Sequence, residues 1–65
     1  MTFRITRLDA VTGKKLICGT ALTYQRAVDA ADGVGRNYRD KPITIYHSDD
    51  MDEPIGVVIV PRDAT

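Results

Sequence analysis

One histidine, His47, stands directly before a segment rich in carboxylates. An imidazole beside carboxylates is a combination that binds divalent cations, so this segment is the first candidate for a metal site. The spacing does not fit a calcium-binding loop: counted from Asp50, Pro54 takes the fifth position and Gly56 comes one residue late. The chain has no second histidine and no paired cysteines for zinc. We therefore expect an acidic loop that holds no metal, formed by Asp49, Asp50, Asp52 and Glu53.

Two glycine-containing segments resemble fragments of phosphate-binding motifs. The GxG at 33–35 follows a predicted helix, whereas a dinucleotide fingerprint follows a strand. The Gly-Lys pair at 13–14 lacks the first glycine of a phosphate loop and the helix that must come after it. Turn formation explains both patterns, so we expect no phosphate-containing cofactor and no other cofactor.

The single cysteine, Cys18, is the strongest candidate nucleophile. A nucleophilic cysteine needs a base and a group that orients the base, and the only histidine lies 29 positions further along the chain. A small buried hydrophobe is the commoner role for a free cysteine. The sequence therefore predicts that Cys18 is buried and that the protein is not an enzyme, with no catalytic residues.

The elements that could position any site must fit into a short chain. Its 65 residues predict one domain over 1–65, with a flexible tail at 62–65. The hydrophobic fraction of 43% and charged fraction of 28% are those of a globular protein. A core of this size is marginal, so a flat binding surface is easier to build than a deep cleft.

Charge and cysteine content bear on partners and location. The formal net charge is zero, which gives no bulk attraction to nucleic acid or to an anionic membrane. The longest apolar run, 57–60, is far too short to cross a bilayer, and the N-terminal segment lacks an apolar run of signal-peptide length. A lone cysteine fits a reducing compartment. We expect a cytoplasmic protein with no membrane partner.

Alternation of apolar and polar residues predicts strands near 2–8, 15–19, 42–47 and 55–60. Asp9 and Gly13 suit the turn that joins the first two strands. Thr23 is a plausible N-cap for a helix over 23–33, and the glycines at 33 and 35 predict that this helix ends between Ala31 and Gly35.

The order of these elements predicts an α+β fold, ββαββ, with a four-stranded and mainly antiparallel sheet and one helix packed on one face. On the last strand, alternation assigns Val57 and Ile59 to the helix side. The opposite face then carries a mixture of apolar, aromatic and basic side chains that is too hydrophobic for a face with no partner. We assign partner binding to this face, through Arg4, Thr6, Ile17, Tyr46, Val58 and Val60.

The favoured function is a noncatalytic protein-binding module that uses this sheet face or an exposed edge strand. The partner is another protein or a second copy in a homodimer. The hairpin–helix–hairpin outline is similar in general shape to small phage- or plasmid-encoded proteins that inhibit a host enzyme, although no motif carries the likeness. The alternative is a nucleic-acid-binding domain that uses the basic first hairpin, through Arg4, Arg7, Lys14 and Lys15.

Overall fold

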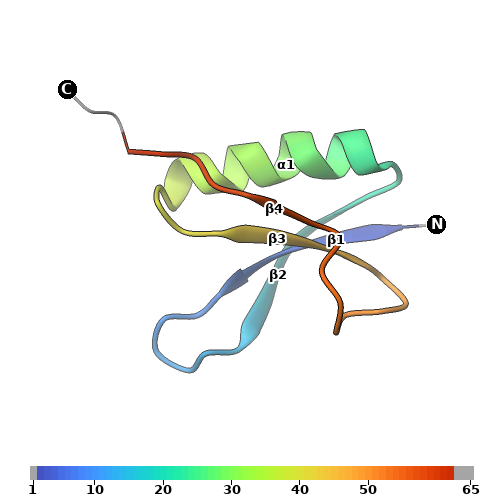
Figure 1. The fold of residues 1–65 in the computed structure, drawn as a ribbon, viewed down its shortest axis with the longest axis horizontal. Coiled ribbons are helices and arrows are strands. Elements are labelled where there is room, and N and C mark those ends of the chain that lie inside the picture. The colour runs from blue at the N-terminus through green and yellow to red at the C-terminus, as the bar shows by residue number, and fades with distance from the viewer. Residues whose placement is uncertain (1, 63–65) are drawn as a thin grey trace.

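A hairpin, a helix and a second pair of strands follow one another along the chain in the computed structural model, which describes residues 2–62. The strands form one antiparallel sheet in the order β2-β1-β3-β4, and α1 lies along one face of it (Figure 1). The predicted α+β class and ββαββ order are confirmed. The elements are β1 (Phe3–Leu8), β2 (Lys15–Ala21), α1 (Tyr24–Asn37), β3 (Ile43–His47) and β4 (Gly56–Val58).

The turn between β1 and β2 is built around Asp9, as the sequence predicts. The Asp9 carboxylate accepts hydrogen bonds from the Val11 amide at 3.0 Å and from the Thr12 hydroxyl at 2.9 Å. Gly13 has a φ of 72°, which glycine adopts without steric cost, and its amide donates to the Asp9 carbonyl at 2.8 Å. The side chain of Asp9 therefore stabilises the turn through hydrogen bonds to residues of the turn itself.

The helix begins as predicted and ends later than predicted. The Thr23 hydroxyl accepts a hydrogen bond from the Arg26 amide at 3.2 Å, which confirms the N-cap. The predicted end between Ala31 and Gly35 is wrong, because α1 continues to Asn37. Gly35 is buried against the sheet, and this packing outweighs the cost of about 1 kcal/mol that each glycine imposes on a helix.

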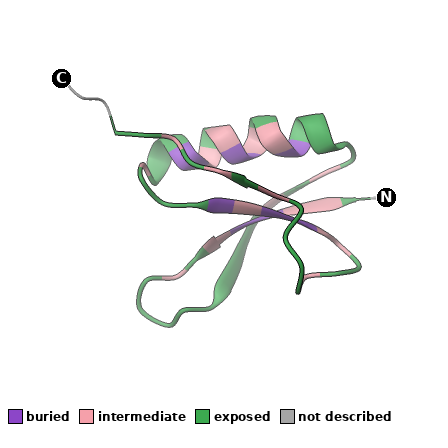
Figure 2. Ribbon diagram, viewed as in Figure 1, coloured by how far each residue is buried: buried purple, intermediate pink, exposed green. Residues whose placement is uncertain are grey.

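The core lies between α1 and the two central strands. Ile5 of β1 is paired with Ile45 of β3, and both are fully buried, as is Ile43 (Figure 2). Ala27 and Ala31 are the fully buried side chains that α1 contributes. Their small size lets the helix lie close to the isoleucine side chains.

The side chains of the last strand face the opposite way from the prediction. Gly56 is paired with Ile45, and Val58 with Ile43, so Gly56 and Val58 share the helix face with those core residues. Val57 points away from the helix and is 55% exposed. The physical reason is steric: a β-carbon at position 56 would collide with the Tyr24 hydroxyl, so the residue facing Tyr24 must be a glycine.

Val60 also lies on the helix side, where its side chain approaches Gly35. The assignment of Val58 and Val60 to the partner-binding face is therefore wrong. Both belong to the packing between the C-terminal segment and the helix.

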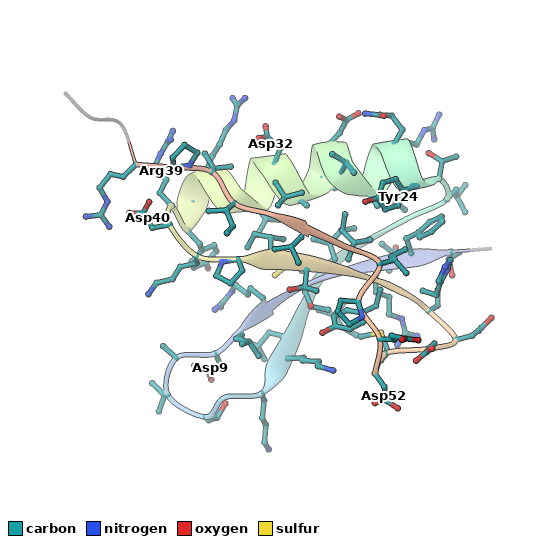
Figure 3. All side chains as sticks on the ribbon, viewed as in Figure 1. Asp9, Tyr24, Asp32, Arg39, Asp40 and Asp52 are labelled. Atoms are coloured by element: carbon teal, nitrogen blue, oxygen red, sulfur yellow. The ribbon has the colours of Figure 1, made fainter. Side chains whose placement is uncertain are left out.

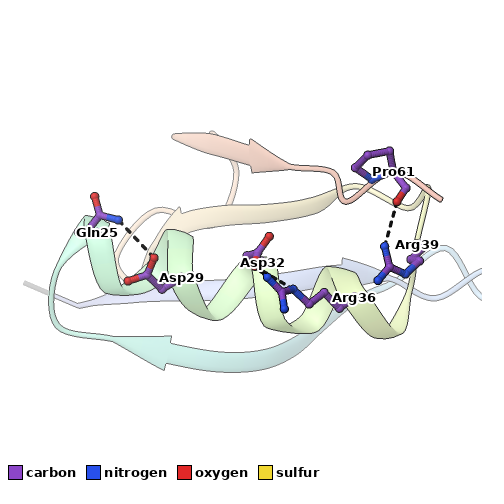
Figure 4. A network of polar contacts seen from close by, with 6 residues as sticks. All are labelled: Gln25, Asp29, Asp32, Arg36, Arg39 and Pro61. Carbon is purple, nitrogen blue, oxygen red and sulfur yellow. Dashed lines mark hydrogen bonds and ion pairs between the residues drawn. The ribbon is translucent and has the colours of Figure 1, made fainter. Parts of the chain in front are cut away.

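The C-terminal segment is tied to the loop between α1 and β3. The Asp40 amide donates to the Val60 carbonyl at 3.0 Å, and the Asp40 carboxylate accepts from the Arg62 amide at 3.0 Å and pairs with its Nε at 3.2 Å. The Arg39 guanidinium donates to the Pro61 carbonyl at 3.0 Å (Figure 4). These contacts engage Arg62, the first residue of the predicted flexible tail, and the rest of that tail, 63–65, lies outside the described residues.

The solvent face of α1 carries polar pairs at helical spacing. Gln25 donates to Asp29 at 3.3 Å, and Arg36 forms an ion pair with Asp32 at 3.1 Å (Figure 4). Such pairs lie on one side of a helix because residues four apart are neighbours. Within residues 2–62, no helix is both long and apolar enough to cross a bilayer.

Candidate functional site: the sheet face opposite the helix

The face of the sheet opposite α1, here called the outer face, is assembled from all four strands. The register places Ile17, Thr6, Thr44 and Val57 in one row across β2, β1, β3 and β4. These residues alternate with the core isoleucines, so their side chains point away from the helix. The same alternation gives the full outer face as Arg4, Thr6, Leu8, Lys15, Ile17, Thr20, Thr44, Tyr46 and Val57, and Ile59 extends it beyond the end of β4.

The row has apolar ends and a polar centre. Ile17 and Val57, at the two edges of the sheet, are each 55% exposed. Thr6, in the centre, is only 1% exposed, and its hydroxyl donates to the Thr44 carbonyl at 3.2 Å. The Thr6 hydroxyl is therefore already used within the sheet, and the most exposed side chains of the row are the aliphatic ones at its two ends.

Tyr46 lies on the outer face, as predicted. The sequence also suggested an exposed aromatic anchor at this position, and that part of the prediction is wrong. Its side chain is only 7% exposed. The Lys15 side chain crosses β1 from β2 and places its ammonium group 4.6 Å from the centre of the Tyr46 ring. The same ammonium group donates to the Met51 carbonyl at 2.6 Å, which brings the acidic loop to this face. Tyr46 is therefore a buried residue of the outer face, and the Lys15 ammonium group covers its ring.

The basic residues of the first hairpin do not form one patch. Arg4 is paired with Tyr46 and lies on the outer face, whereas Arg7 is paired with Ile43 and lies on the helix side. The Arg7 guanidinium is 4.4 Å from the centre of the Tyr38 ring. Lys15 is already engaged with Tyr46, so the cluster seen in the sequence is divided between two faces.

The acidic segment is organised as a turn. The Asp50 amide donates to the His47 carbonyl, and the Asp52 amide donates to the Asp50 carboxylate, both at 3.1 Å. The His47 ring packs on Phe3, 5.1 Å between centroids, on the helix side of the sheet. Among residues 2–62, no group of three or more potential metal ligands comes together.

Cys18 is exposed, so the prediction that it is buried is wrong. The pairing runs from Ile5 with Gly19 to Thr6 with Ile17, which leaves Cys18 as the additional residue of a β-bulge. The Cys18 thiol donates to the Leu16 carbonyl at 3.6 Å. A bulge breaks simple alternation, and for this reason the predicted inward direction of Cys18 was not observed.

Val57 and Ile59 are the two residues of this surface that the sequence prediction assigned to the core. Every residue from Val57 to Val60 is apolar, so hydrophobicity does not reveal which side of the strand faces the helix. The available signal was Gly56, since a glycine inside a strand often marks a close approach. With that position facing the helix, Val57 and Ile59 must point outward.

No family model, curated protein or solved structure matches the chain. The outer face is therefore interpreted from its own geometry.

Proposed function

We propose that this chain is a noncatalytic protein-binding domain that binds another protein, or a second copy of itself, through the outer face. The observation that carries the proposal is the exposure of Ile17, Val57 and Ile59, which are 55%, 55% and 56% exposed on the sheet face opposite α1, and no other helix is present in residues 2–62. Apolar groups gathered on one side of a small domain are typical of interaction surfaces.

The chemistry of the outer face favours a protein partner. Aliphatic side chains surround hydroxyl groups, and Arg4 and Lys15 add cationic groups beside them. Protein interfaces also combine exposed apolar side chains with a few polar and charged groups, and arginine is enriched in them. The proposed binding residues are Arg4, Ile17, Val57 and Ile59, while the buried Thr6 and Tyr46 support this surface from below.

An edge strand offers a second way to bind within the same proposal. Both β2 and β4 lie at sheet edges, and β2 is the longer, with seven residues against three. The bulge at Cys18 interrupts the β2 edge, and bulges of this kind discourage pairing with another strand. We therefore favour side-chain contacts through the outer face over strand addition.

Inhibition of a host protein by a phage- or plasmid-type factor is one role that this mode of binding would serve, and we place it in the cytoplasm. Binding of nucleic acid is the alternative. It receives less support, because Arg4 and Arg7 lie on opposite sides of the sheet and Lys15 is held against Tyr46.

Replacement of Val57 by lysine tests the proposal. Val11, in the hairpin turn, is 90% exposed and lies away from the outer face, so Val11→Lys is a control with the same chemical change. Sedimentation velocity over a range of concentrations measures self-association, and affinity capture from a cell lysate measures binding to another protein. We expect the wild type and Val11→Lys to behave alike and Val57→Lys to lose self-association or capture.

Two results would count against the proposal. One is a wild-type chain that neither self-associates nor captures a protein. The other is a Val57→Lys variant that retains the wild-type interaction. Treatment of the lysate with nuclease separates the alternative, because capture that depends on nucleic acid would disappear on treatment and would fall steeply with added salt.

A further inference from the structure

A pocket of about 390 Å³ is lined by residues from the base of the β1–β2 hairpin and from the segment that joins α1 to β3. Figure 1 shows that this hairpin projects away from the helix. Figure 3 shows Asp9 in the hairpin and Arg39 and Asp40 in that segment at the same end of the molecule. The lining residues are Arg7, Leu8, Asp9 and Ala10 from the hairpin and Tyr38, Lys41 and Pro42 from the segment.

The pocket is mainly apolar. Leu8, Ala10, Pro42 and the ring of Tyr38 supply hydrocarbon surface. Sites for small molecules usually measure between about 300 and 1,000 Å³, with apolar walls and a few polar groups that set orientation. The pocket falls within that range, at its smaller end, and suits a ligand with a compact apolar body.

The polar groups of the pocket are mostly cationic. Within residues 2–62, neither Arg7 nor Lys41 forms an ion pair. The one carboxylate in the lining, Asp9, accepts hydrogen bonds from Val11 and Thr12 in its own turn; these bonds, the Val11 amide first, lower its pKa, and the charge of Arg7 adds a smaller effect in the same direction. The pocket therefore has two cationic side chains and one carboxylate, and the oxygens of that carboxylate already accept hydrogen bonds from the hairpin turn.

The Arg7 guanidinium is oriented by its contact with an aromatic ring. It lies 4.4 Å from the centre of the Tyr38 ring, a cation–π contact. Within residues 2–62 it forms no ion pair, and its fork of N–H groups matches the two oxygens of a carboxylate.

The opposite wall of the pocket is held in place by backbone contacts. The Tyr38 amide donates to the Gly35 carbonyl at 3.1 Å, and the Lys41 amide donates to the Tyr38 carbonyl at 3.0 Å. Between them, Asp40 has a φ of 67° and is bound to Val60 and Arg62. The positions of Tyr38 and Lys41 are therefore largely formed before any ligand arrives, which lowers the entropic cost of binding.

We propose that this pocket binds a small organic carboxylate with an apolar body. The carboxylate lies between Arg7 and Lys41, and the apolar body packs against Tyr38 and Pro42. None of the residues proposed above to bind a protein lines this pocket, so its binding does not depend on the proposed protein partner.

The test is a titration of ¹⁵N-labelled protein followed by NMR, with 3-phenylpropionate as the probe and 3-phenylpropionamide as its neutral counterpart. A ligand of this size binds with a Kd on the order of 1 mM. We expect amide chemical-shift changes concentrated at 7–10 and 38–41, and a Kd for the amide ligand at least about tenfold higher, since it lacks the charge that pairs with Arg7.

Arg7→Gln should raise the Kd for 3-phenylpropionate about tenfold, because glutamine removes the charge and the fork. Lys14→Gln removes the same charge on the same hairpin outside the pocket, and should leave the Kd unchanged. If the spectrum of Arg7→Gln shows an unfolded chain, Lys41→Gln replaces it, with a several-fold increase expected.

The proposal is overturned if 3-phenylpropionate causes no shifts at several times the expected Kd. It is also overturned if the amide binds equally well, or if Lys14→Gln weakens binding as much as the substitution within the pocket does. In that last case the attraction is general to the charge of the hairpin.

Discussion

Gly35 of α1 faces Val60 at a distance that leaves no room for a side chain between them. A β-carbon at position 35 would lie 2.8 Å from Cγ2 of Val60 and 3.6 Å from Cγ1 of Ile43. The helix therefore lies closer to the C-terminal segment than any residue other than glycine allows. This approach explains why the helix continues through a residue that the sequence suggested would end it.

Gly35→Ala should lower the free energy of unfolding by about 1–3 kcal/mol, because the added methyl group overpacks the contact with Val60. Gly33→Ala is the matched control, since a β-carbon there has no atom within 4 Å. It should raise the free energy of unfolding by up to about 1 kcal/mol, because alanine is the better helix former. Urea unfolding measures both, and equal effects at the two positions would contradict the packing described.

Gly56 and Tyr24 form a second close contact, between β4 and the start of the helix. A β-carbon at position 56 would collide with the Tyr24 hydroxyl. Gly56→Ala should therefore cost about 1–3 kcal/mol in the wild type. In a Tyr24→Phe background, where the hydroxyl is absent, the cost should fall by about 1 kcal/mol. A double-mutant cycle measured by urea unfolding gives this coupling, and strictly additive effects would show that the hydroxyl does not set the direction of β4.

Asp9 should make the stability of the domain depend on pH in acid. Hydrogen bonds from Val11 and Thr12 stabilise its carboxylate, so its pKa in the folded protein is below the ordinary value of 3.8. A lowered pKa contributes stability that is present above 3.8 and is lost as pH falls through the folded value.

The measurement is unfolding of the wild type and Asp9→Ala from neutral pH down to below 3.8. The wild type should be the more stable at neutral pH, and the difference should shrink as the solution becomes acidic. A difference that stays constant across this range would show that the carboxylate charge has no part in the turn.

Local chemistry made much of this fold predictable. The alternation in β1 and β3, the turn at Asp9 and the N-cap at Thr23 each depend on neighbouring residues, and all three are observed. The bulge at Cys18 and the burial of Tyr46 depend on how strands twist and pair across the sheet, which residue types along one strand do not specify.

The sequence was enough to predict where the candidate site lies, but it did not identify all of the residues that form it. The uncovered sheet face follows from having one helix for four strands. Which residues of β4 belong to this face could not be predicted, because a strand that is apolar throughout has no polar side to identify the solvent-exposed one. The contact between Gly56 and Tyr24 decides which side of β4 faces the helix.

Substitution by lysine should have very different effects on stability at the neighbouring residues Val57 and Val58. Val58 packs on the core, so Val58→Lys should bury a charge and largely unfold a domain of this size. Val57 is more than half exposed, so Val57→Lys should change stability by about 0.5 kcal/mol or less. Thermal melts followed by circular dichroism distinguish the two variants. A folded Val58→Lys together with an unfolded Val57→Lys would reverse the assignment of the faces.

The outer face as the binding surface is tested most directly by methyl NMR. With ¹³C-labelled isoleucine and valine methyl groups, spectra are recorded across a concentration series of the chain alone and after addition of a captured partner. We expect the methyl signals of Ile17, Val57 and Ile59 to shift or broaden on binding, while those of the buried Ile5, Ile43 and Ile45 change little. Shifts confined to the helix side, or a complex that leaves Ile17 and Val57 unchanged, would contradict this expectation.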